Sequence, residues 1–474
     1  MLDKSTIKEV LDVAMAKGGD FADIFIEEKK TTGIGCEAGK IERIQSGMDM
    51  GAGIRVLSGD TTAYAYTNNL TRKGLVEVAR IVNHAAHGLK KEVSLNLTKV
   101  KPSVDFIYKE RPDEVSTERK VAVVEAADRT ARAVDSNQIK QVIVGYADVV
   151  QKVVIANSAG VFVEDERIRT RLLVQAVAAA DGKIQTGYEA VGSLSGFELF
   201  DRCHPEEVAE VAARRSVQML AAKPAPAGKM PVVMAGEAGG TMVHEACGHG
   251  LEADLVQKGL SVYAGKKDQE VASPEVTVID DATISDRYGS YRFDDEGTPA
   301  RKVELIRKGM LTDYLYDRLT AMRETNDSNG HGRRESYQHK PIPRMSNTYI
   351  APGKTDPDKI IGNIREGLLV KKMGGGQVNT TTGDFVFEVT EGYLIKDGET
   401  GPMVRGATLT GNGPDVLRTV EAVGSDLGFT IGTCGKDGQG VPVSDAQPTI
   451  SIKQLIIGGT AHPPERSAGR IIRL

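Results

Sequence analysis

Two spacings of hydrophobic residues alternate along the first half of the chain. Helical spacing, with apolar residues three and four apart, marks residues 5–17, 72–89 and 116–134. A fourth helix is predicted from Pro205 to about Ala222, because proline suits the first position of a helix. Strict alternation of apolar and polar residues marks the intervening strands, which are residues 21–28, 33–44, 50–66, 140–156 and 161–190. The pattern predicts an antiparallel sheet with packed helices, and Gly182-Lys183 is the expected turn of the last hairpin.

A break rich in proline and glycine at residues 223–228 divides the chain. We expect an N-terminal α+β domain over residues 1–225 and a C-terminal domain over residues 226–474. The second half begins with a short buried strand at residues 231–234, followed by a helix over roughly residues 239–257. Short strands separated by glycine turns follow the helix and predict a barrel or sandwich. The fold class is therefore α+β, with a β-rich second domain that carries one prominent helix.

Composition narrows the classes of function. The chain has 474 residues, which is too long for one compact core, and its net charge of −5 comes from well-mixed acidic and basic residues. That balance argues against a nucleic-acid partner. The sequence contains no apolar stretch of about 18 residues and no signal-peptide pattern, so we expect no membrane span. Four scattered cysteines are typical of a reducing compartment, and we expect a cytoplasmic protein.

The segment His244-Glu245-Ala-Cys-Gly-His249 carries the most specific chemistry in the sequence. Imidazole is the commonest protein ligand of metals, and a neighbouring carboxylate is the usual base for activating water. Five positions on a regular helix turn the second histidine by about 140°, which is too far for both rings to reach one ion easily. Either the helix widens locally as a π-bulge or it ends before His249, and Gly248 tolerates such a distortion. Two histidines near a helix end that bind no metal are the simpler alternative.

A catalytic zinc ion needs a third protein ligand. Cys434 lies in a segment with four glycines in ten residues, which gives the backbone freedom to present a thiolate. Cys247 is closer in sequence, but its direction depends on the distortion of the helix. Spacing and context favour Cys434 over Cys247. Glu252 and Asp254 are alternative ligands or hydrogen-bond partners of the histidines.

Several segments together resemble the TldD/PmbA family over most of the chain. They are His244–Asp254, Gly432–Val443, Asp294–Ala300, Gly332–Tyr337 and Gly383–Val389. The resemblance implies a metallopeptidase with one Zn²⁺ per chain, held by His244, His249 and Cys434, with Glu245 as the catalytic base. It also implies unfolded or unstructured peptide substrates. It further implies a dimer, either of like chains or with a paralogous subunit that lacks the histidine motif.

The sequence identifies substrate contacts less specifically than it identifies metal ligands. A zinc-bound water activated by Glu245 would attack the peptide bond, and the developing charge needs another donor. The long basic segment at residues 323–345 offers His331, Arg333, Arg334, Tyr337 and His339. An extended peptide could add as a strand to a sheet edge near the metal. The N-terminal domain would suit a dimer interface or a chamber wall.

Three other functions remain open on the sequence alone. The chain could be a non-catalytic, zinc-containing subunit that binds peptides or regulates a partner. It could regulate a DNA-acting enzyme, which the charge balance argues against. It could also be another metallohydrolase, such as an amidase of small amides.

Overall fold

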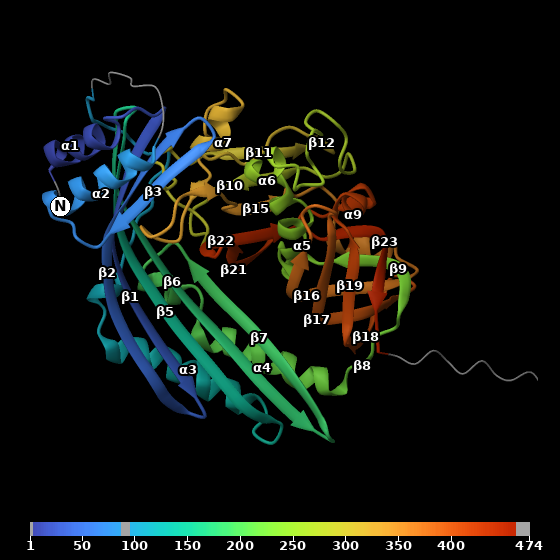
Figure 1. The fold of residues 1–474 in the computed structure, drawn as a ribbon. Coiled ribbons are helices and arrows are strands. Elements are labelled where there is room, and N and C mark those ends of the chain that lie inside the picture. The colour runs from blue at the N-terminus through green and yellow to red at the C-terminus, as the bar shows by residue number, and fades with distance from the viewer. Residues whose placement is uncertain (1–2, 87–94, 461–474) are drawn as a thin grey trace, which may run out of the picture.

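A computed structural model describes residues 3–86 and 95–460 of the chain, and its architecture is α+β, as predicted. The first half forms a 7-stranded sheet. Its main path is β3 (Thr61–Thr67), β2 (Lys40–Ser58), β1 (Phe21–Glu37), β5 (Ile139–Asn157), β6 (Val161–Ala180) and β4 (Thr98–Lys99), and β7 (Lys183–Ser193) also pairs with β6. The helices are α1 (Lys4–Ala14), α2 (Arg72–Ala85), α3 (Thr117–Val134) and α4 (Pro205–Ala221). The strands are long and cross the molecule beside the second half (Figure 1).

Alternation along these strands divides the sheet into two faces. Ile24 and Ile26 pack with α1 and α2, whereas Ile34 packs with α3 and α4. Residues of the other parity, such as Phe25 and Val163, pack against residues of the C-terminal half. The sheet therefore has one face for its own helices and one for the second half of the chain.

The hairpin between β6 and β7 turns one residue earlier than predicted. β6 ends at Ala180 and β7 begins at Lys183, so the turn residues are Asp181 and Gly182. Their φ angles are 50° and 73°. A two-residue hairpin turn of this type needs positive φ at both positions, which aspartate and glycine tolerate better than lysine. The prediction of Gly182-Lys183 was therefore wrong by one residue.

The second half contains a closed five-stranded barrel. The barrel runs β16 (Glu366–Val378), β9 (Gly228–Met234), β23 (Ile450–Gly458), β19 (Ala407–Asn412) and β17 (Asp384–Lys396), and β16–β17 pairing closes it. β18 (Glu399–Arg405), β8 (Lys223–Pro224) and β20 (Val420–Val423) extend this sheet. Closure removes the free edges that an open sheet would leave.

A 6-stranded sheet stands beside the barrel. Its order is β12 (Met310–Leu311), β11 (Lys302–Arg307), β10 (Val278–Asp281), β15 (Asn347–Ile350), β22 (Gln439–Gln447) and β21 (Gly428–Lys436). Short elements connect the strands, namely α7 (Arg318–Arg323), β13 (Gly332–Arg333), β14 (Ile342–Pro343), α8 (Pro357–Gly362) and α9 (Gly413–Arg418). β21 is the last strand of this sheet, so one of its edges has no partner strand among the described residues.

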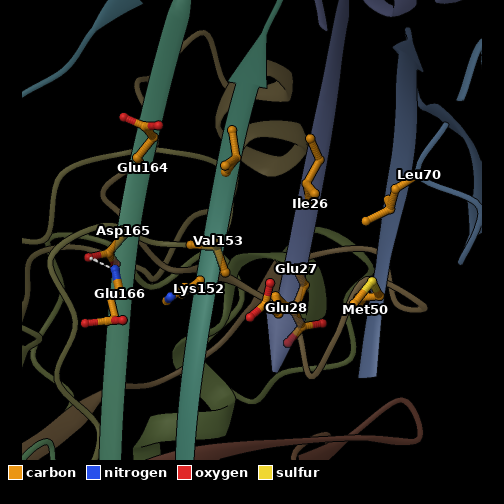
Figure 2. Close-up of a pocket in the computed structure, with 11 residues that line it drawn as sticks. Ile26, Glu27, Glu28, Met50, Leu70, Lys152, Val153, Glu164, Asp165 and Glu166 are labelled. Atoms are coloured by element: carbon orange, nitrogen blue, oxygen red, sulfur yellow. Dashed lines mark hydrogen bonds between the residues drawn. The ribbon is translucent and has the colours of Figure 1, made fainter. Parts of the chain in front are cut away.

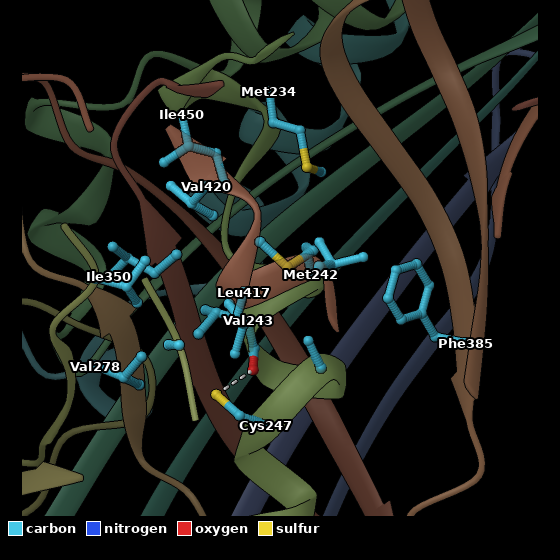
Figure 3. Packing of buried hydrophobic residues seen from close by; sticks show 14 of the residues in the cluster. Met234, Met242, Val243, Cys247, Val278, Ile350, Phe385, Leu417, Val420 and Ile450 are labelled. Atoms are coloured by element: carbon cyan, nitrogen blue, oxygen red, sulfur yellow. Dashed lines mark hydrogen bonds between the residues drawn. The ribbon is translucent and has the colours of Figure 1, made fainter. Parts of the chain in front are cut away.

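The segment with the histidine motif is buried between these two sheets. Met242, Val243 and Cys247 lie in the core with barrel residues such as Phe385 and Ile450 (Figure 3). Burying side chains of this size stabilises the fold by about 1.5–3 kcal/mol each. The apolar side of the segment is thus fixed in the core, which leaves its polar side for chemistry.

Candidate metal centre

The backbone at the motif departs from a regular α-helix, as the spacing of the histidines predicted. α5 (Thr241–Val243) continues into a π-helical turn over His244–Gly248. The N–H of His249 donates to the carbonyl of His244, five residues back. The wider turn brings the two imidazole rings together, with centroids 4.9 Å apart and planes at 86°. The local distortion therefore places both histidines where one ion can reach them.

Two glycines allow the π turn to pack closely. A Cβ atom on Gly248 would lie 2.1 Å from the sulfur of the buried Met345. A Cβ atom on Gly413, in α9, would lie 2.1 Å from the carbonyl oxygen of Ala246. Larger residues at either position would displace the turn, because interiors are packed too tightly to absorb such overlaps.

The segment after the π turn redirects the chain. A short 3₁₀ turn covers His249–Leu251, Glu252 is extended, and α6 (Ala253–Gln257) follows. The long helix expected over residues 239–257 is therefore several short pieces, because the π turn and the extended Glu252 interrupt it.

Cys434 of β21 completes a cluster with the two histidines. The potential ligand atoms of His244, His249 and Cys434 all lie within 4.8 Å of one another, and the three residues form a buried group. The sulfur of Cys434 is 3.5 Å from Nε2 of His249. Burial opposes ionisation of this thiol, but the charges and hydrogen bonds of His244 and His249 outweigh it and lower the pKa of Cys434 to about 5. The thiolate, which is the form that binds metal, is thus favoured at neutral pH.

Cys247 does not join this cluster. Its sulfur lies 3.3 Å from the carbonyl oxygen of Val243, inside the hydrophobic core (Figure 3). Burial raises the pKa of Cys247 to about 12. A thiol that is protonated and turned into the core is a structural residue.

Each histidine is oriented by a carboxylate on its other nitrogen. Nδ1 of His244 lies 2.7 Å from Oδ1 of Asp445, and Nδ1 of His249 lies 3.0 Å from Oε2 of Glu252. Metal-binding histidines commonly bond to a carboxylate in this way, which fixes the ring and its tautomer. The arrangement leaves the Nε2 atoms free to face the cysteine.

A buried lysine balances the charge of these carboxylates. Nζ of Lys436 is 3.1 Å from Glu252 and 2.6 Å from Asp254. Asp254 therefore lies in an ion pair and not in the group of His244, His249 and Cys434. The sequence analysis missed Asp445 and Lys436. Lys436 had a usable signal, since it lies two residues after Cys434 on the same strand and shares its face, whereas no local pattern marked Asp445.

Glu245 lines the same cavity as the three candidate ligand residues. The cavity has a volume of about 670 Å³, and Thr430 to Asp437 of the β21 hairpin form one wall. Burial raises the pKa of Glu245, while the nearby histidines oppose the rise. A carboxylate with a raised pKa is better matched to proton transfer near neutral pH than an exposed one.

The structure places the basic segment outside the lining of this cavity. His331 is fully buried, with Nε2 2.9 Å from Asp280. Arg333 and Arg334 are also buried, and Tyr337 packs against the N-terminal sheet with its backbone N–H 2.9 Å from Glu27. His339 is half-buried, 3.1 Å from the hydroxyl of Ser336. These five residues make contacts within the protein, and none of them lines the cavity of His244, His249 and Cys434.

Another cavity, of about 510 Å³, lies across the N-terminal sheet (Figure 2). Its lining comes mainly from β1, β2, β5 and β6 and mixes apolar residues with carboxylates such as Glu28 and Glu166. None of the clustered ligand residues lines it. This cavity is therefore separate from the chemistry described above.

Comparison with known proteins relates nearly the whole chain to one family. Three family models match, described as domain 1 (residues 22–87), the central domain (110–220) and the C-terminal domain (227–459) of the PmbA/TldA metallopeptidases. The chain is 34% identical over 470 residues to a metalloprotease TldD homologue of Haemophilus influenzae, covering 97% of both chains. It is 37% identical to a metalloprotease of Methanocaldococcus jannaschii, covering 94% of this chain and 97% of the relative.

A further relative carries zinc in its name. The zinc metalloprotease TldD homologue of Saccharolobus solfataricus is 26% identical, and the match covers 93% of this chain and 97% of the relative.

Within the described residues, no helix is long and apolar enough to cross a membrane.

Solved structures share the fold at low sequence identity. A candidate modulator of DNA gyrase from Thermotoga maritima matches with a TM-score of 0.79 at 23% identity, covering 96% of this chain and all of its own. TldE from Thermococcus kodakarensis matches with a TM-score of 0.77 at 19% identity, with the same coverage. At these identities the likeness establishes the fold alone.

Proposed function

Because the chain belongs to the TldD/PmbA family of metallopeptidases, we propose that it cleaves unstructured peptides with one zinc ion held by His244, His249 and Cys434. The observation that carries the proposal is the buried cluster of two imidazoles and one thiol, all within 4.8 Å, beside Glu245. Three protein ligands and one open position are typical of catalytic zinc, whereas structural sites have four.

The donor set fits zinc. Two imidazole nitrogens and one thiolate are ligands that zinc prefers, and the carboxylates bonded to both Nδ1 atoms leave the Nε2 atoms available to hold an ion. Zinc bound there supplies a Lewis acid that polarises a carbonyl and lowers the pKa of water.

Glu245 is the proposed proton carrier. One oxygen of its carboxylate takes a proton from the attacking water and later delivers it to the nitrogen of the leaving amine. Burial raises the pKa of Glu245, which makes its carboxylate a stronger base for the first of these transfers. Glu245 is half-buried and lines the cavity, which would put its carboxylate beside a peptide bound there.

The free edge of β21 is the proposed binding site for the peptide backbone. β21 carries Cys434 and is the last strand of its sheet, and its residues line the cavity. An extended peptide that pairs with this edge gains main-chain hydrogen bonds regardless of its sequence. A folded protein could not present an extended strand there, so selection for unstructured chains follows.

A dimer is the proposed working form, with a like chain or a paralogous subunit. β2 extends beyond β3, and its residues 40–50 pair only with β1 in the described structure. Ile44, Met48 and Met50 on this segment are 49%, 58% and 36% exposed. Unpaired strand edges with apolar residues are prone to association. We assign the N-terminal sheet to this interface or to the wall of a chamber around the site.

Two substitutions test the proposal. Glu245→Gln should keep the zinc content and lose peptide cleavage, whereas Cys434→Ala should lose bound zinc as well. Glu237→Gln is the matched control, since Glu237 is exposed and paired with Lys371. Mass spectrometry of cleaved peptides and metal analysis of the same samples give both readouts. Full cleavage by Glu245→Gln would overturn Glu245 as the proton carrier. Zinc binding without any cleavage by the unaltered protein would favour a non-catalytic, peptide-binding subunit.

A further inference from the structure

Three arginines alternate along β6 and share one face of the N-terminal sheet. Arg167, Arg169 and Arg171 occupy every second position of the strand, so all three point away from the sheet's own helices. They line a cavity of about 220 Å³ between the sheet and the β21–β22 hairpin. Lys29 of β1, Arg333 and Arg334 add to the lining, whose acidic members are Asp295 and Glu335. Six cationic side chains therefore surround this arginine cavity.

The acidic residues of the lining are already engaged. Asp295 pairs with Arg167 at 2.5 Å and accepts the backbone N–H of Arg334 at 2.7 Å. Glu335 accepts the backbone N–H of Gly440 at 2.6 Å. These contacts leave the remaining cations without a carboxylate from the lining.

Two of the arginines are buried and form no ion pair among the described residues. Arg169 donates to the carbonyls of Tyr288 and Ser290, both at 2.8 Å. Arg333 donates to the carbonyls of Met345 and Pro442. Burial lowers the pKa of Arg169 most. The charges of Arg333 and Arg167 lower it further, to about 10. A buried charge held only by neutral acceptors is costly, and an added anion would offset that cost.

Arg171 and Lys29 remain half-buried on the same face, and neither has an ion pair in the part of the chain that the structure describes. Guanidinium groups in such a position can bind a carboxylate with two parallel hydrogen bonds. The cavity thus combines buried positive charge with cations that solvent or a ligand can reach.

The arginine cavity adjoins the proposed peptide site. Thr433 lines both this cavity and the cavity of the metal cluster. Thr433 and Cys434 are successive residues of β21, so their side chains point to opposite faces of the strand. A peptide paired with the edge of β21 would likewise send alternate side chains to the two faces.

We propose that the arginine cavity binds a carboxylate of the peptide substrate, either an acidic side chain or the free C-terminus. The proposal rests on the peptidase function proposed above and adds a preference for acidic peptides. The site would hold one part of the peptide while a neighbouring part lies beside His244, His249 and Cys434. Arg171 makes the contact, Arg169 and Arg333 supply the buried positive field, and Lys29, two strands away on β1, adds positive charge to the lining.

Equilibrium binding of three fluorescent peptides to the zinc-loaded Glu245→Gln protein tests this site without turnover. The peptides share one neutral sequence. The first is amidated, the second is amidated with one aspartate, and the third has a free C-terminus. We expect the aspartate peptide or the free-acid peptide to bind about tenfold more tightly than the neutral one, which tells the two sources of carboxylate apart. Arg171→Gln in the Glu245→Gln background should remove most of this preference, and Lys29→Gln in the same background should remove less.

Arg171→Lys keeps the charge and should retain part of the preference. Arg129→Gln, on the exposed side of α3, is the matched control and should change nothing. Equal binding of all three peptides, or an unchanged preference in Arg171→Gln, would overturn the carboxylate site and leave the peptidase proposal standing. Absence of binding for every peptide would overturn both.

Discussion

The sulfur of Cys434 lies 3.5 Å from Nε2 of His249, although 185 positions separate the two residues. His249 follows a π turn in the core, and Cys434 lies on the last strand of the sheet beside it. A further pair of contacts connects the same two segments, because Lys436 of β21 bonds to Glu252 and Asp254 beyond the π turn. The cluster of His244, His249 and Cys434 is therefore built from two segments of the chain, and the ion pairs of Lys436 connect the same two segments.

Removing the carboxylate behind His244 should weaken metal binding. Asp445→Ala loses the acceptor 2.7 Å from Nδ1 of His244, so the ring is free to rotate. We expect zinc affinity to fall about 10–100-fold, measured by competition with a chelator of known affinity. Asp445→Asn, which keeps an acceptor oxygen, should lose less. Asp415→Ala, at an exposed pair with Arg418, serves as the control. Unchanged affinity in Asp445→Ala would show that the contact does not orient the ligand.

Crowding the π turn should disturb both stability and the metal cluster. Gly413→Ala would place a Cβ atom 2.1 Å from the carbonyl oxygen of Ala246, and backbone cannot yield as a flexible side chain does. We expect the free energy of unfolding to fall by about 1–3 kcal/mol, with weaker zinc binding. Gly435→Ala is the control, because its Cβ would meet nothing within 4 Å although it follows Cys434 directly. Equal effects of the two substitutions would contradict this account of the turn.

The buried lysine should be far more important than an exposed one. The Lys436 side chain is 8% exposed in its pairs with Glu252 and Asp254. Lys436→Met leaves Asp254 without its cation and Glu252 with only His249 and Arg344. Breaking a buried pair from one side costs about 3–5 kcal/mol. Lys267→Met removes an exposed pair with Asp313 and should cost less than about 1 kcal/mol. Denaturant unfolding of the metal-free proteins compares them, and similar losses would refute the proposed role of Lys436.

Asp280 should make stability depend on acid pH. Burial alone would raise the pKa of Asp280, but the charge of His331 and hydrogen bonds from His331, Ser346 and Thr348 lower it to about 2. A carboxyl with a lowered pKa in the folded state stabilises above its unfolded pKa of about 4, and loses that stabilisation as the pH falls through about 2. The shift corresponds to about 2 kcal/mol.

Asp280→Asn should therefore be less stable than the parent at pH 5, and the difference should shrink as the pH falls from about 4 towards 2. Urea unfolding of both proteins across this range measures it. Glu237→Gln, at an exposed residue paired with Lys371, provides a comparison that should vary little. A difference that grows on acidification would reverse the assigned sign.

The sequence by itself determined the features that depend on neighbouring residues. Periodicity predicted the helices of the first half and the alternation of its strands. Apolar residues recur at the spacing that places them on the buried face of each element. Pro205 correctly marked the start of α4. The five-residue spacing of His244 and His249 required a distorted helix, and the π turn confirms that requirement. The motifs and their resemblance to one family predicted Cys434 as the third ligand.

Tertiary structure decided what depends on long-range contacts. Closure of the barrel, the ion pairs of Lys436 and the carboxylate behind His244 join segments whose separation leaves no local pattern. The sequence offered the basic segment for substrate contacts, yet His331 and Arg333 are buried because Asp280 and backbone carbonyls supply their partners. Burying a polar group costs little only when its partners are in place. Those partners come from distant parts of the chain, and only the fold brings them together.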